Sequence, residues 1–184
     1  MDDFEQEKEF EKFQSAIGSE SDPTILVLRA HLFSENLLER LINFKLPRGD
    51  KVIENGNLSY HQKLVLVESL DCIPDSIVSS LRNLNKLRNQ CAHELNKKIS
   101  DGDVTRIGSP LGKEFTRLKR KSKFDDAILL RSVINYVCGF MTASCHVSEH
   151  SELALSQGSE GNEGITRRST GAAQKAAQAG EFKR

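Results

Sequence analysis

The chain has 184 residues, and its 26 Lys and Arg balance 26 Asp and Glu, so the formal net charge is zero. This length supports one compact domain, with or without tails, and leaves little room for two cores. A neutral chain is not basic throughout, as histone-like proteins are. The lack of Trp and an aromatic content of 6% argue against an aromatic stacking platform for single-stranded nucleic acid.

The compartment is indicated by what the chain lacks. It starts Met1-Asp2-Asp3-Phe4, without the basic start and apolar stretch of a secretory signal. The longest uncharged run, residues 132–147, is shorter than the roughly 20 apolar residues of a membrane span. The four cysteines have no C-x-x-C spacing and are interpreted as reduced thiols. We expect a cytoplasmic protein with no membrane contact, cofactor or metal.

Residues 1–22 form an acidic beginning, with eight acids against two lysines. Phe10, Phe13 and Ile17 recur at spacings of three and four, which predicts a short amphipathic helix within residues 1–21. Acids in its first turn would suit the helix dipole.

The main domain is predicted to begin at Asp22, a helix cap, with Pro23 at the first helical position. A helix of about twenty residues follows, because apolar residues recur at helical spacing along one face. These are Leu26, Ala30, Phe33, Leu37, Leu41 and Phe44. Residues 45–57 contain Pro47, Gly49 and Gly56 and are predicted to be a loop.

Two further helices are predicted in the middle of the chain. Ser59 and Gln62 form a capping box, so one helix begins there and runs towards Leu70. Pro74 and Asp75 open the next, whose apolar stripe is Ile77, Leu81, Leu84, Leu87 or Arg88, Cys91 and Leu95. Residues 99–123 carry three glycines and a proline and are predicted to be irregular.

A final long helix is predicted from about Asp125, with an apolar stripe of Ala127, Leu130, Ile134, Val137, Met141 and Ser144. Residues 148–184 have little to bury and are predicted to be a disordered tail. No segment shows the alternation of a strand. The fold class is therefore all-α, a four- to five-helix up-and-down bundle over residues 22–147.

The segment 84–95 is the most informative part of the chain. Arg82, Asn85, Asn89 and His93 fall on one side of its helix and form a polar stripe. Arg88 lies about 140° around a regular helix from His93, so the two do not face one ligand squarely from one straight helix. Asn is a poor helix former, so its repeated use indicates a function for this stripe.

Arg88-Asn89-Gln90-Cys91-Ala92-His93 resembles the R-N-x-x-x-H signature of HEPN-superfamily domains, which are small all-helical proteins. The upstream segment 56–70 looks like the corresponding helix of mannitol-repressor-type proteins. The resemblance covers about residues 22–145 and implies a HEPN-type bundle. Many such domains are metal-independent RNases, toxins or defence proteins, some of which pair with an antitoxin.

The resemblance implies a catalytic role for Arg88, Asn89 and His93. RNA cleavage without metal needs a base, an acid and positive charge on the phosphate. His93 would be the base or acid and Arg88 the phosphate clamp, with Asn89 orienting the imidazole or binding a phosphate oxygen. It also implies a homodimer with two facing motifs. The alternative is a non-catalytic, mannitol-repressor-like regulator or interaction module.

A basic run follows, with six cations and one acid in residues 113–123. Clustered cations bind phosphates without reading sequence, so RNA is the expected partner. The alternatives are a solvated loop and a partner for the acidic N-terminus. The candidate nucleic-acid contacts are Arg82, Lys113, Arg117, Lys119, Arg120, Lys121 and Lys123.

His31 and Glu35 are four residues apart on the first long helix. A hydrogen bond from Glu35 towards the motif helix is one interpretation. A polar residue satisfied at the edge of the core is the other.

Overall fold

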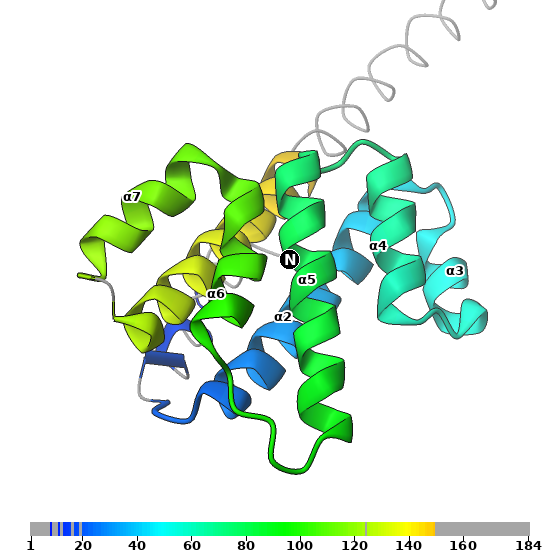
Figure 1. Ribbon diagram of the computed structural model, residues 1–184. Helices are drawn as coiled ribbons and strands as arrows, with labels where there is room; N and C mark the ends of the chain where they lie inside the picture. The colour runs from blue at the N-terminus through cyan, green and yellow to red at the C-terminus, as the bar shows by residue number, and fades with distance from the viewer. Residues whose placement is uncertain are drawn as a thin grey trace, which may run out of the picture. The chain divides into compact units, whose positions relative to one another are not determined.

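The computed structural model describes residues 8, 11, 13–15, 17–18, 20–123 and 125–149 (Figure 1). The described residues are helical with short connections and contain no strand, which confirms the all-α class. The chain divides into two compact units, Met1–His146 and Val147–Arg184. The elements below belong to the first unit, except for the last turn of the final helix.

The N-terminal helix and α2, Pro23–Lys45, begin the fold as predicted. The described residues between 8 and 18 are helical, Ile17 is fully buried and the ring of Phe13 stacks on Phe33. Phe10 lies outside the described residues. The Asp22 side chain accepts a hydrogen bond from the backbone N–H of Thr24 at 2.7 Å, which caps α2.

The predicted loop over 45–57 is wrong for most of its length, because α3 spans Gly49–Gly56. Gly49 is buried, and a Cβ there would collide with the α2 backbone at Ile42 and Asn43. Glycine is needed at this position so that the chain can fold back closely against α2. The glycine that suggested a loop therefore allows two helices to pack.

The next two helices are close to the prediction. The helix α4 spans Tyr60–Ser69 behind the Ser59–Gln62 capping box, in which both reciprocal hydrogen bonds are present. The helix α5 spans Asp75–His93 and buries Ile77, Leu81, Leu84 and Leu87 of the predicted stripe. Leu95 lies beyond its end and is 99% exposed, so its place in that stripe was wrong.

Residues 99–123 are not irregular, which corrects another prediction. They form α6 (Asp101–Gly108), the short 3-10 helix η1 (Ser109–Leu111) and α7 (Lys113–Lys121). A capping box of Ser100 and Asp103 starts α6. A methyl group at Gly108 would overlap the Phe115 ring, so this glycine leaves room for α7 to pack.

The final helix, Asp126–Glu149, starts one residue after the predicted position. It is the one helix among the described residues that is long and apolar enough to cross a membrane, and half of its most apolar window is buried in the fold. Core helices of soluble proteins have the same profile. Of its predicted stripe Leu130, Ile134, Val137 and Met141 are buried, whereas Ala127 is exposed.

The core joins these elements around α2 and α5. The helix α2 packs against α3, α4 and α5, and α5 packs in turn against α4, α6 and η1. Cys138 and Cys145 are fully buried, Cys72 and Cys91 are half-buried, and all four are free thiols. Burial raises the pKa of the Cys138 thiol, as expected for an unreactive core residue. The predicted tail lies outside the described residues from residue 150 on.

Candidate functional site

The three motif residues lie on the C-terminal half of α5, and His93 is its last residue. Arg88 is half-buried, whereas Asn89 and His93 are exposed. Arg88 Nη1 donates a hydrogen bond to Asn89 Oδ1 at 3.2 Å. Asn89 shares a face with His93, one turn and about 6 Å further along the helix. The hydrogen bond holds the guanidinium beside Asn89, on the face of α5 that also carries His93, while the Cα positions of Arg88 and His93 stay about 140° apart around the helix.

The other two members of the predicted polar stripe are held by different helices. Arg82 Nη2 donates to Glu68 Oε2 on α4 at 2.7 Å. Asn85 Oδ1 lies 3.0 Å from Nε2 of His31 on α2. Arg82 and Asn85 therefore anchor α5 to its neighbours, while Asn89 and His93 face solvent.

His31 is a buried residue that the sequence alone did not place at the motif helix. Its exposed fraction is 4%, and its ring stacks on Tyr60 of α4 with centroids 4.1 Å apart. Burial lowers the His31 pKa; the hydrogen bond with Asn85 opposes this change, and the charge of Arg88 lowers the pKa further. His31 is therefore a neutral imidazole near pH 7 and lies within the electrostatic reach of Arg88.

Glu35 makes an ion pair with α4, not with the motif helix. Lys63 Nζ lies 2.7 Å from Glu35 Oε1 and 2.6 Å from Glu39 Oε1. Burial alone would lower the pKa of Lys63, but the hydrogen bonds to the two glutamates outweigh it and raise the pKa. This triad ties α2 to α4 beside His31, so the interpretation of Glu35 as a satisfied core-edge residue is the better one.

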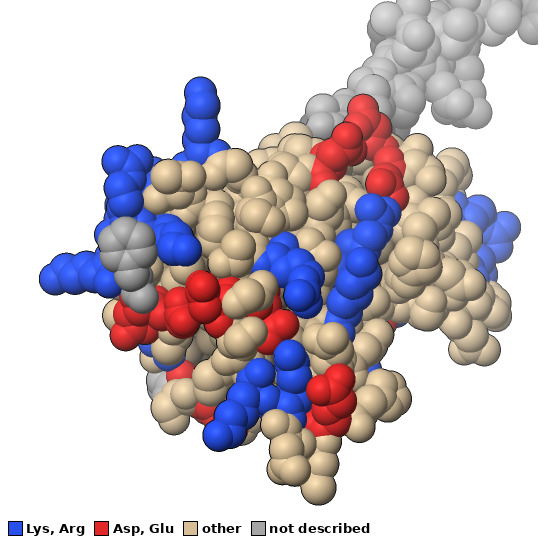
Figure 2. Space-filling model, in the orientation of Figure 1, with Lys and Arg blue, Asp and Glu red and all other residues tan. Residues whose placement is uncertain are grey.

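The basic run forms most of α7 and lies apart from the motif. Phe115 and Leu118 are buried on the inner side of α7, while Lys113, Arg117, Arg120, Lys121 and Lys123 are exposed and Lys119 is half-buried. Figure 2 shows Lys and Arg side chains gathered at the edge of the molecule where α7 lies. In Figure 1 this edge is remote from the C-terminal end of α5, so the cations of α7 and the Arg88–Asn89–His93 motif do not form one cluster.

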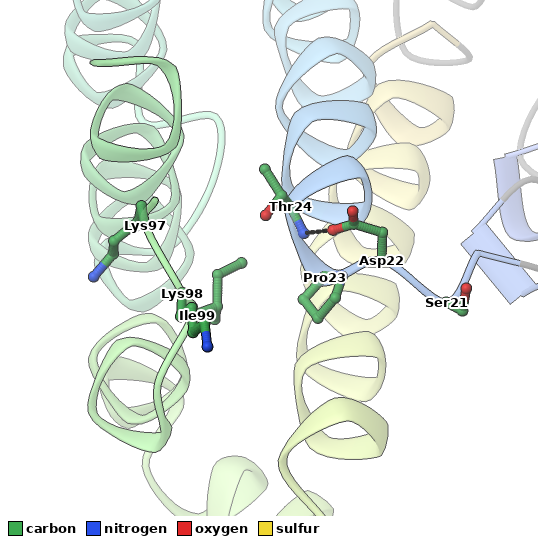
Figure 3. A pocket seen from close by; sticks show the side chains of 7 residues that line it. All are labelled: Ser21, Asp22, Pro23, Thr24, Lys97, Lys98 and Ile99. Atoms are coloured by element: carbon green, nitrogen blue, oxygen red, sulfur yellow. Dashed lines mark hydrogen bonds between the residues drawn. The ribbon is translucent and has the colours of Figure 1, made fainter. Parts of the chain in front are cut away.

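A pocket of about 450 Å³ lies beside the chain that leaves α5 (Figure 3). One wall is the start of α2, and the other is the segment that connects α5 to α6. Lys97 Nζ is bound to Asp103 at 3.0 Å, so the pocket has one of its two lysines already paired. The lining residues are Ser21, Asp22, Pro23, Thr24, Lys97, Lys98 and Ile99.

One signal in the sequence bears on the parts that were missed. The Ser100-x-x-Asp103 pattern is a capping box and could have indicated α6. The pairing of His31 with Asn85 has no such signal, because 54 residues separate them. The pocket likewise joins two segments that are distant along the chain. Among the described residues, no group of three or more His, Cys, Asp or Glu side chains is arranged to hold a metal ion.

Comparison with known proteins yields no match for this chain, whether to a protein-family model, a curated protein or a solved structure.

Proposed function

We propose that this protein is a cytosolic HEPN-type bundle that acts on RNA as a metal-independent endoribonuclease of the toxin or defence type. The observation that carries the proposal is the hydrogen bond from Arg88 to Asn89, a residue on the same exposed face of α5 as His93. A cation and an imidazole on one accessible face are the groups that phosphodiester cleavage requires in the absence of a metal.

Each residue has a role in this proposal. Arg88 binds the scissile phosphate and stabilises its developing charge. His93 removes the proton of the 2′-hydroxyl or protonates the leaving 5′-oxygen, and Asn89 holds the guanidinium in place. One imidazole does not readily perform both proton transfers in one turnover. A homodimer that brings two motifs together supplies the second histidine.

Two exposed leucines support the dimer. Leu95, two residues after His93, is 99% exposed, and Leu32, which follows His31 on α2, is 64% exposed. Burying one leucine completely contributes about 1.5–3 kcal/mol, so these residues favour association with a second protein surface. The cations of α7 would add phosphate contacts outside the cleavage site.

The second candidate is a non-catalytic regulator of the mannitol-repressor-like type, which would act by binding an antitoxin or another regulatory protein. The separation of α7 from the C-terminal end of α5 favours it, because a binding protein does not need its cations beside an imidazole. The exposed leucines serve a protein partner as well as a second copy.

Cleavage of total RNA in EDTA by the wild type and by His93→Ala tests the proposal. We expect 2′,3′-cyclic ends from the wild type and a loss of about 10²–10⁴-fold in the variant. His61→Ala is the control, because His61 is exposed on α4 outside the motif, and it should cleave normally. Wild-type protein that leaves RNA intact overturns the catalytic proposal and favours the regulator. A monomer by light scattering at micromolar concentration overturns the shared site.

A further inference from the structure

His31 is enclosed by polar groups of three helices. The face of its ring stacks on Tyr60 of α4, and its Nε2 atom contacts Asn85 of α5. Ser34 Oγ donates its one hydrogen to the His31 carbonyl oxygen at 2.9 Å. The Tyr60 hydroxyl lies 3.0 Å from Ser34 Oγ and must therefore be the donor in that hydrogen bond. Contacts within α2 and with α4 therefore already hold both the backbone and the ring of His31.

The contact with Asn85 determines where the ring carries its proton. Because Asn85 presents its carbonyl oxygen, His31 donates through Nε2, and a neutral imidazole then has no hydrogen on Nδ1. Nδ1 is buried and has no hydrogen-bond partner among the described residues. A buried lone pair without a partner is less costly than a second N–H without one, which favours this tautomer and disfavours the imidazolium.

Asn85 transmits this constraint to the motif. It lies three residues before Arg88 and four before Asn89, so the three side chains emerge from adjoining parts of α5. The hydrogen bond between Asn85 and His31 ties this part of α5 to α2. We propose that His31 is a positioning residue for the candidate site and acts through Asn85 on Arg88 and Asn89. This inference rests on the proposed function.

The charges around His31 make its protonation state part of this arrangement. Glu35 favours the imidazolium, whereas Lys63 and Arg88 disfavour it. Tyr60 contributes its ring face and, through burial, has a raised pKa, so it stays neutral. A proton on His31 would repel the Arg88 guanidinium and give Nδ1 a hydrogen without an acceptor. The arrangement of the motif therefore requires neutral His31.

The first test does not depend on RNA cleavage. An NMR titration follows the His31 ring, assigned by its loss in His31→Gln, in the wild type and in Arg88→Gln. We expect a higher His31 pKa in Arg88→Gln, because a nearby positive charge has been removed. Arg82→Gln is the matched control: it removes a cation from the same helix, but one that is paired with Glu68. An equal His31 pKa in all three proteins overturns the coupling of His31 to Arg88.

The second test compares two substitutions of His31 by their cleavage rates. His31→Phe keeps a ring against Tyr60 and removes the donor to Asn85, whereas His31→Gln keeps a side-chain N–H donor. We expect kcat to fall by roughly 10- to 100-fold in His31→Phe, with KM little changed, and to recover largely in His31→Gln. Equal rates in the two variants, with both folded by circular dichroism, overturn the positioning role.

The two tests separate this inference from the proposed function. If the wild type does not cleave RNA, the proposed function fails, and the titration alone decides whether His31 and Arg88 are coupled. If the wild type cleaves and the two His31 variants have equal rates, the endoribonuclease stands and His31 is a structural residue only.

Discussion

The polar residues of α5 and α7 differ in what holds them. On α5, Arg82 is bound by α4, Asn85 by α2, and Asn83 donates to the Arg106 carbonyl of α6 at 2.8 Å. On α7, Arg117 pairs with Glu114 of the same helix, and no ion pair between described residues involves Lys119, Arg120 or Lys121. Contacts with neighbouring helices hold Arg82, Asn83 and Asn85 of α5, whereas the cations of α7 remain at the surface.

This difference matches the chemistry proposed for each region. Proton transfer depends on the placement of a few atoms, so the helix that carries the exposed His93 must itself be held in place by its neighbours. Phosphate attraction by clustered cations acts over several ångströms and needs no fixed geometry. The predictions below test whether α5 is the structural centre and α7 a peripheral charged helix.

The largest expected effect on stability comes from truncating the core of α5. Leu81 is fully buried, and Leu81→Ala should lower the free energy of unfolding by about 2–5 kcal/mol. Leu118 on α7 is 7% exposed, and Leu118→Ala should cost less, because this peripheral helix can adjust to the cavity. Urea unfolding measures both. A larger loss in Leu118→Ala would contradict the peripheral role of α7.

A methyl group at Gly108, the last residue of α6, should weaken the packing of α7 and leave that of α5 unchanged. Gly108→Ala places a Cβ against the Phe115 ring and should destabilise the protein by about 1–3 kcal/mol. Hydrogen exchange should then speed up in α7 and stay slow in α5. Gly102→Ala in the same helix is the control, since its Cβ meets only Ser100 Oγ at 3.6 Å, and it should be neutral or stabilising. Equal exchange of α7 in both variants would contradict this account.

Acid should destabilise the α5 side of the fold through His31. The pKa of His31 in the native protein lies below the ordinary histidine value of 6.5, because the ring is buried, so the unfolded state binds more protons between those two values. Stability is therefore complete above about pH 6.5 and declines as the pH falls towards the native pKa. Urea midpoints at about pH 7.5 and 5.5 measure the decline, which should be smaller in His31→Gln. An identical decline in the variant would show that His31 does not carry it.

Neutralising α7 should have the smallest effect on stability and a clear effect on binding. Changing Lys119, Arg120 and Lys121 to Gln should alter the free energy of unfolding by less than about 0.5 kcal/mol. The same change should reduce the slope of log affinity for single-stranded RNA against log salt by about 2 units. The control neutralises Lys45, Arg48 and Lys51, which are exposed on the α2–α3 side. An equal loss of slope in the control would remove α7 as the RNA surface.

Local signals predicted the long helices well, because helix caps act within a few residues. Asp22 with Pro23, and Ser59 with Gln62, start α2 and α4 as expected. The short helices were missed because Gly49 and Gly108 were interpreted as breaks in helical structure. Each glycine instead permits close contact with a segment elsewhere, α2 for Gly49 and Phe115 for Gly108. That need is visible only when both partners are in place.

The amino-acid sequence is enough to predict the all-α class, the caps of the long helices, the basic run, and a single helix that carries Arg88, Asn89 and His93. These features depend on the spacing of residues along the chain, because helix caps form between residues a few positions apart and apolar faces follow the helical period. The packing of the helices is needed to show that Asn85 meets His31 and that α7 lies apart from the end of α5. The physical reason is that buried polar groups must find partners across helices, and the packing of those helices determines which partner each group finds.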